Sequence, residues 1–388
     1  MPILKLEFED VKHPWHLLPV AFDDFNLLVG LSGVGKTRTL RLLNRLGQAA
    51  RGTGHDLGDC QWTVEVETSA GTYAWRAKTE ADASAGNADD EDDDAVVRVP
   101  ARSKARFVAE EVVSEAGAIV ARRTADELSI QGQAVPRLRS RDSIISLIDE
   151  EPILSLRQAL AGIHFSRART ERPVLYDQSK LKRLLEEEPS LESLKENRKL
   201  DLVTKAYLLR QRFPEQFAKV EEQLIDIFGT IEQLDVGRTS ELSRRRFVDE
   251  PFDFLVPAFR ERGIDGWVDA FDMSSGMHRT LLHLLELHLE PPGSVLLVDE
   301  YENGMGVNCL PQVTDTLFER RGEVQLVFTS HHPYVINNVP KEQWRIMRRR
   351  GHEVEVLRKG DVARLDTASE IDSFVQLINA PEFTEGLA

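Results

Sequence analysis

The clearest chemical signal in the sequence is one glycine-rich octapeptide, Gly30–Thr37, which reads GLSGVGKT. It matches the pattern G-x-x-x-x-G-K-[ST] at every position. Its glycines let the backbone turn so that N–H groups point at phosphate oxygens. Lys36 is expected to reach the β- and γ-phosphates, and the Thr37 hydroxyl to hold Mg²⁺. The residues predicted to bind the nucleotide here are Gly30, Ser32, Gly33, Gly35, Lys36 and Thr37.

A second signal is the acidic pair Asp299-Glu300, which directly follows the apolar run 295–298. Ligands of α/β sheets bind at the carboxyl ends of the strands, where this pair is expected to lie. Asp299 is predicted to order the Mg²⁺ shell, and Glu300 to polarise the water that attacks the γ-phosphate. The alternative, an exposed surface pair, is weakened by the phosphate loop in the same chain.

Two weaker signals lie between and after these motifs. Ser274, Ser275 and Gly276 precede the helical pattern 279–289, and hydroxyl and N–H groups at a helix start can bind phosphate. The alternative is an ordinary helix cap by either serine. His331 follows the apolar run 324–328 and is placed to sense a γ-phosphate, although such a histidine can also be structural. No Cys/His spacing elsewhere in the sequence supports zinc.

The order of the four motifs resembles that of the ABC-type ATPases. Within them, the chain is similar to the soluble branch that contains RecF and the heads of structural-maintenance-of-chromosomes (SMC) proteins, and to short bacterial AAA-family ATPases, several of which belong to phage-defence operons. The resemblance implies that Gly30–Thr37 is the Walker A loop and that Ser274–Gly276 is the signature motif. It implies that Asp299 is the Walker B acid, which would bind the metal together with Thr37, and that Glu300 is the catalytic base. Glu302–Gly304 would be the D-loop and His331 the switch histidine.

The resemblance also implies cofactors and assembly. ATP with Mg²⁺ would lie between the Walker A loop of one subunit and the signature of another. With one copy of each motif, the chain is expected to form a head-to-tail homodimer or higher oligomer through ATP, with Lys36, Glu300 and His331 as its catalytic residues. Ser275 and Met277 depart from the transporter signature, which favours the soluble branch. The glutamine of the Q-loop stays open among Gln131, Gln133 and Gln158.

The expected function is therefore an ATPase that dimerises on ATP and switches a partner, either an effector protein or DNA, in phage defence or DNA maintenance. One alternative is the ATPase subunit of a membrane transporter. A second alternative, a nuclease, requires a further metal-dependent domain, for which the stretch 332–388 after the switch histidine is expected to be too short.

Composition limits the classes of protein that the sequence can represent. The 388 residues carry a net charge of −16, with 41% apolar residues and two cysteines. No run approaches the roughly 20 apolar residues of a membrane span, and no signal peptide precedes the first motif, so a cytoplasmic protein without a membrane partner is expected. Eight acids crowd residues 80–94, and all but the first of them lie in a segment, 81–95, that is predicted to be a disordered loop. DNA stays possible because arginines cluster at 137–141, 167–172, 244–246 and 348–350.

Strand and helix patterns place these motifs on an α/β fold. Short apolar runs at 25–29, 295–298 and 324–328 alternate with helical patterns, which is typical of a parallel sheet covered by helices. The predicted class is a P-loop NTPase with an ABC-type head, built from a mixed or antiparallel N-terminal lobe on a parallel core, with a helical insertion. The predicted domains are 1–170, the N-terminal part of the head; 171–250, the insertion; and 251–388, the C-terminal part of the head.

Overall fold

A computed structural model describes most of the chain, and it divides into two compact units. The described residues are 2–53, 57–81, 105–136, 139–168, 174–187, 190–243, 253–306, 308–362 and 373–384. The first unit comprises Met1–Phe165, Gly293–Tyr301 and Val324–Ala388, and the second Ser166–Pro292 and Glu302–Glu323. These divisions differ from the boundaries at 170 and 250 expected from the sequence. The acidic loop expected at 81–95 lies, from residue 82 on, outside the described residues.

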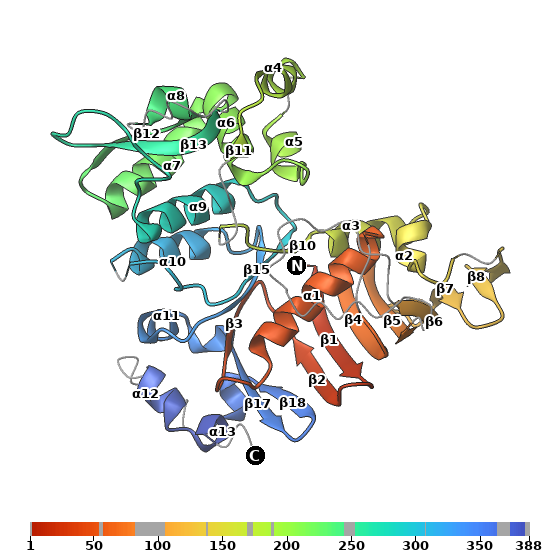
Figure 1. Ribbon diagram of the computed structural model, residues 1–388. Helices are drawn as coiled ribbons and strands as arrows, with labels where there is room; N and C mark the ends of the chain where they lie inside the picture. The colour runs from red at the N-terminus through yellow and green to blue at the C-terminus, as the bar shows by residue number, and fades with distance from the viewer. Residues whose placement is uncertain are drawn as a thin grey trace. The chain divides into compact units, whose positions relative to one another are not determined.

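The first unit contains one large mixed sheet (Figure 1), with strand order β10-β15-β16-β3-β17-β18-β2-β1-β4-β5-β6-β7-β8-β9. The strands are β1 Ile3–Asp10, β2 Trp15–Ala21, β3 Phe25–Val29, β4 Cys60–Thr68, β5 Gly71–Ala81, β6 Ala105–Ser114, β7 Ile119–Arg123, β8 Leu128–Ile130, β9 Gln133–Ala134, β10 Ile163–Phe165, β15 Val295–Val298, β16 Gln325–Thr329, β17 Trp344–Arg350 and β18 Glu353–Leu357. Neighbours from β10 to β17 are parallel, whereas β2, β1 and β4 to β9 form antiparallel pairs. The predicted fold class, a parallel core joined to an antiparallel N-terminal lobe, is confirmed.

The parallel core has fully buried strands, as the mostly apolar runs predict. Every residue of β3, β15 and β16 is buried. The first unit also contains helices α1 Lys36–Arg51, α2 Ile144–Leu147, α3 Ile153–Ala161, α11 Pro333–Asn338, α12 Ser373–Ile378 and α13 Pro381–Thr384, and the 3-10 turns Lys341–Gln343 and Lys359–Asp361. The leucines of α1 pack with Ile3, Leu6 and Trp62 in one core, so α1 is fixed against the sheet beside the end of β3.

The second unit combines helices with a small antiparallel sheet. Its helices are α4 Gln178–Glu186, α5 Leu191–Glu196, α6 Leu202–Arg212, α7 Pro214–Ile227, α8 Thr239–Leu242, α9 Ser275–Leu289 and α10 Leu310–Glu319. Its strands are β11 Val174–Leu175, β12 Ile231–Arg238, β13 Phe254–Glu261 and β14 Val268–Asp269, with β13 paired to the other three. The segment 171–250, which is expected to be a helical insertion, also contributes β11 and β12. Among the described residues, no helix is both long and apolar enough to cross a membrane.

Candidate functional site

The glycine-rich loop joins the end of β3 to the start of α1, and its conformation depends on its glycines. Gly33 and Gly35 have φ angles of 86° and 112°, which residues with a Cβ rarely adopt. A Cβ on Gly30 would lie 2.5 Å from the backbone oxygen of Met347. A Cβ on Gly35 would lie 3.2 Å from Nε1 of Trp15. Both positions therefore admit only glycine without displacement of the loop or its neighbours.

Lys36, the first residue of α1, is buried and reaches back across the loop. Its Nζ donates hydrogen bonds to the carbonyl oxygens of Gly30, at 2.7 Å, and Leu31, at 3.0 Å. Burial lowers the pKa of Lys36 to about 8, while the nearby charges of Asp299 and Glu300 act in the opposite direction. The ammonium group is thus charged at neutral pH. In the described part of the chain, its hydrogen-bond partners are these two carbonyl oxygens of the loop.

The structure brings Thr37 and Asp299 together at the carboxyl edge of the parallel strands. The Thr37 hydroxyl donates to Oδ1 of Asp299 at 3.2 Å. Asp299 directly follows β15, and Val298 is in register with Phe328 of the parallel neighbour β16, so the ends of these strands are level. Parallel register is the reason that residues separated by 262 positions in the chain meet at one edge.

Thr329, the last residue of β16, connects both acids and was not predicted as a site residue. Its hydroxyl donates to Oδ1 of Asp299 at 2.7 Å and accepts a hydrogen bond from the backbone N–H of Glu300 at 2.7 Å. The signal available in the sequence was a hydroxyl residue at the end of the second apolar run. Its meaning depends on the pairing of β15 with β16, which the sequence does not reveal.

Glu300 is half-buried and has a left-handed backbone, with a φ of 47°. The left-handed conformation is unfavourable for a residue that has a Cβ, and such backbone strain is concentrated at functional sites. The hydrogen bond from its N–H to Thr329 and the adjacent bond from Tyr301 N to the Thr329 carbonyl, at 3.0 Å, hold this conformation. The backbone of Glu300 is therefore anchored to the end of β16.

The two histidines after β16 differ in their surroundings. His332 is the N-cap of α11, and its Nδ1 accepts from the backbone N–H of Tyr334 at 3.2 Å, which is a structural function. His331 is exposed and lies two residues after Thr329, the end of the strand that contacts Asp299. Within the described part of the chain, no group of three or more potential metal-ligating His, Cys, Asp or Glu side chains is found.

In the second unit, the serines before the helical pattern lie at the start of α9. The Ser274 hydroxyl caps this helix by accepting from Met277 N at 3.2 Å, so the capping alternative holds for this residue. Ser275 is the first helical residue, and both serines are exposed. Gly276 lies close to another backbone segment, because a Cβ there would be 3.2 Å from the N–H of Gly306.

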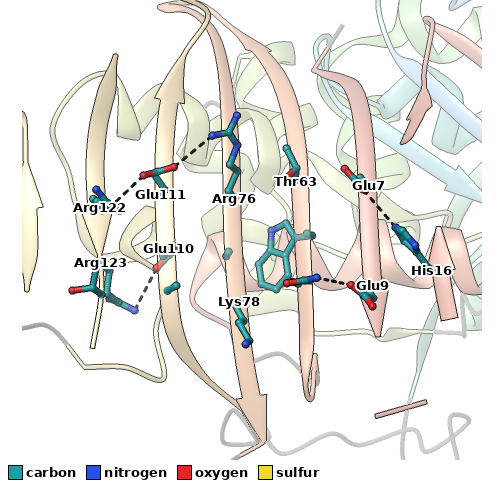
Figure 2. A pocket seen from close by; sticks show the side chains of 15 residues that line it. Glu7, Glu9, His16, Thr63, Arg76, Lys78, Glu110, Glu111, Arg122 and Arg123 are labelled. Carbon is teal, nitrogen blue, oxygen red and sulfur yellow. Dashed lines mark hydrogen bonds and ion pairs between the residues drawn. The ribbon is translucent and has the colours of Figure 1, made fainter. Parts of the chain in front are cut away.

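A hollow of about 470 Å³ lies elsewhere in the first unit, along strands β1, β2 and β4 to β7 (Figure 2). Figure 2 shows Glu111 between Arg76 and Arg122, and both arginines form ion pairs with it at 3.5 Å. His16 faces Glu7 at 3.5 Å in the same hollow. These are cross-strand pairs typical of the polar face of an antiparallel sheet, and the glycine-rich loop does not line this hollow.

The depressed pKa of Lys36 predicts a pH dependence of phosphate binding. Above about pH 8 the free protein loses the Lys36 proton, so nucleotide must bind with proton uptake and its affinity should fall. An ordinary lysine would keep its charge to roughly pH 10. Calorimetric titration of ATP between pH 7 and 9.5 in buffers of different ionisation enthalpy measures this uptake. The Lys36→Arg variant is the control, because arginine stays charged throughout; equal pH dependence in both proteins would contradict the assignment.

The chain was compared with known proteins. Solved structures with similar folds include an SMC head bound to the C-terminal winged-helix domain of ScpA (14% identity, TM-score 0.45, covering 92% of this chain and 98% of that chain). Another is the Pyrococcus furiosus SMC head with an extended coiled coil, bound to the C-terminal domain of ScpA (14% identity, TM-score 0.44, covering 92% of this chain and 96% of that chain). A third is the Thermotoga maritima SMC head domain (11% identity, TM-score 0.38, covering 92% of this chain and 99% of that chain). No curated protein gave a sequence match.

One family profile covers most of the chain, residues 25–337, from β3 to α11. It carries the description "AAA domain, putative AbiEii toxin, Type IV TA system". The match includes the glycine-rich loop, the Asp299-Glu300 pair and the segment that follows β16. It confirms the part of the predicted resemblance that concerns AAA-family ATPases. The chain belongs to this AAA-domain family and is an ATPase.

Proposed function

We propose that the chain binds ATP on the loop Gly30–Thr37, hydrolyses it with Glu300 as the base, and uses ATP-dependent dimerisation to switch a partner. The observation that carries this proposal is the meeting of Thr37, Asp299 and Thr329 through hydrogen bonds of 3.2 and 2.7 Å beside the loop. Three chain segments that are distant in sequence thus meet at one edge of a sheet: the glycine-rich loop, the acidic pair Asp299-Glu300, and Thr329.

The side chains at this edge fit a magnesium ion. Mg²⁺ prefers oxygen ligands and in nucleotide sites takes only one or two from the protein, with phosphate and water completing its shell. The Thr37 hydroxyl and the Asp299 carboxylate are two such oxygens, already within hydrogen-bonding distance of each other. When bound, the ion would neutralise charge that develops on the phosphates. Thr329 would keep the Asp299 carboxylate oriented towards it.

The chain's own residues would then act in sequence. Backbone N–H groups of the loop bind the phosphates, and the Lys36 ammonium exchanges its two carbonyl partners for phosphate oxygens. Glu300 accepts the proton of the attacking water, and His331 contacts the γ-phosphate. In the proposed dimer, Ser274, Ser275 and Gly276 of a second copy present the N-terminus of α9 to the same phosphate. One copy alone would lack this last set of donors.

The family description, which names a toxin–antitoxin system, supports a role in phage defence, with an effector protein or DNA as the partner that responds to the dimer. Few of the arginines considered for DNA binding support DNA as the partner. Arg348 is engaged with Glu355 at 2.7 and 2.6 Å. The residues Arg137, Arg169, Arg172 and Arg244 to Arg246 lie outside the described part of the chain.

Molar mass in solution tests the dimer. With ATP and Mg²⁺, light scattering after size exclusion should show the Glu300→Gln variant at twice the monomer mass, and with ADP at the monomer mass. The Lys36→Ala variant is the matched control, which should stay monomeric under both conditions because it lacks the phosphate-binding cation. A monomeric Glu300→Gln protein with ATP demonstrably bound would refute dimerisation while leaving nucleotide binding intact.

A further inference from the structure

The first turn of α1 carries an arginine that is held in place by the last residue of β1 and the first residue of β2. Arg38 follows Thr37 of the loop, and its Nη2 donates to Oδ2 of Asp10 at 2.6 Å. Its guanidinium carbon lies 4.5 Å from the ring centre of Trp15, within cation–π range. The Arg38 side chain nevertheless remains 42% exposed. Arg38 is thus a planar group supported on one side and accessible to solvent.

Trp15 gives this arrangement a rigid base. The indole is 1% exposed and contacts Phe8, with the ring centres 5.9 Å apart. It also adjoins the loop, because Nε1 lies 3.2 Å from the position that a Cβ on Gly35 would take. Nε1 has no hydrogen-bond partner among the described residues. The same tryptophan therefore supports the phosphate-binding loop and the guanidinium of Arg38.

Arg38 lies where the sugar and base of a nucleotide bound at the loop are expected. In loops of this type, the backbone N–H groups hold the α- and β-phosphates and the lysine reaches the β- and γ-phosphates. The first turn of the following helix is consequently nearest the α-phosphate, from which the sugar and base extend. Arg38 is the third residue of that helix and presents an exposed plane there.

We propose that the nucleobase of the bound nucleotide stacks on the face of the Arg38 guanidinium opposite Trp15, with Asp10 fixing the plane. This inference rests on the proposed binding of ATP at the loop. The ion pair with Asp10 offsets the charge of Arg38, which favours stacking over a role as a phosphate ligand. Because every base offers a π-face, stacking of this kind is tolerant of base identity, so ATP and GTP should bind with similar affinity.

Nucleotide-binding titrations of variants test this role with three probes: ATP, GTP and inorganic tripolyphosphate. Arg38→Ala should bind ATP and GTP about tenfold more weakly, the effect typical of losing one base-stacking group, and should bind tripolyphosphate as the wild type does. Arg38→Lys, which keeps the charge without the plane, should lose the same affinity. Arg41→Ala, an exposed arginine on the same helix, is the control and should bind all three probes normally.

Two results would overturn the inference: unchanged ATP affinity in Arg38→Ala, or an equal loss of affinity for ATP and tripolyphosphate, which would make Arg38 a phosphate ligand. Asp10→Asn keeps a polar group at the same place and serves as a second variant if Arg38→Ala folds poorly. It should weaken ATP and GTP binding but not that of tripolyphosphate. A wild-type protein that binds none of the probes would contradict the proposed function itself and not the assignment of Arg38.

Discussion

The Glu300→Gln variant is expected to hydrolyse ATP about 100- to 10,000-fold more slowly than the wild type, the range lost when a general base is removed. ATP binding should persist, because the loop, Lys36 and Asp299 are unchanged. Glutamine can keep the left-handed backbone and the hydrogen bond from position 300 to Thr329, since both involve main-chain atoms of that residue. The loss should therefore fall on the chemical step.

Single-turnover hydrolysis with protein in excess over ATP measures that step directly. Glu65→Gln is a suitable control, because this acid lies on the polar side of β4, next to Lys5 and away from the loop. Its hydrolysis rate should equal that of the wild type. A Glu300→Gln protein with undiminished turnover would remove Glu300 from the mechanism.

The Glu110→Gln substitution is expected to lower the free energy of unfolding by about 3–5 kcal/mol, the cost of breaking a buried ion pair by removing one partner. Glu110 is 2% exposed and accepts hydrogen bonds from Trp75 Nε1, at 3.0 Å, Ile144 N, at 2.9 Å, and the Ser143 hydroxyl. It also pairs with the buried Arg123 at 3.3 Å. Burial raises the pKa of Glu110, while Arg123 and these hydrogen bonds act in the opposite direction. The variant leaves the Arg123 charge without its carboxylate.

The neighbouring residue provides the matched control. Glu111 forms its ion pairs with Arg76 and Arg122, whose side chains are more than half exposed. Such pairs contribute about 1 kcal/mol or less, so Glu111→Gln should change stability very little. Equilibrium urea unfolding, followed by tryptophan fluorescence, compares the two variants. Equal destabilisation by both would show that the buried network around Glu110 does not stabilise the first unit in this way.

The sequence predicted the conformation of the loop, because residue type and spacing specify it locally. A turn that places Gly33 and Gly35 in left-handed geometry and Lys36 at a helix start needs no distant residue to be recognised. The structure also brings Thr37 close to Asp299, at the strand edge where the sequence predicts the acid to lie. The roles of both as magnesium ligands stay predictions. The role of Thr329 could not be predicted, because it depends on which strand lies next to β15.

Other parts of the fold were missed for physical reasons that can be named. β13 contains Pro257, and proline normally argues against a strand within a sheet. β12 carries Asp235, an acid that is buried because Arg210 pairs with it at 2.6 Å. Glu110 and Arg123 likewise look like ordinary charged residues until β6 and β7 pair. In each case a tertiary contact outweighs the local preference of the residue.

The central claim, that ATP is hydrolysed between the loop of one copy and α9 of another, is tested most directly by mixing two inactive variants. Lys36→Ala removes the phosphate-binding cation, and Ser275→Arg blocks the start of α9 while leaving the Ser274 cap in place. Each alone should fail to hydrolyse ATP. An equal mixture should regain activity, to at most about half of the wild-type rate, because each mixed dimer holds one intact site of two. Wild-type activity in Ser275→Arg alone, or no activity in the mixture, would contradict the account.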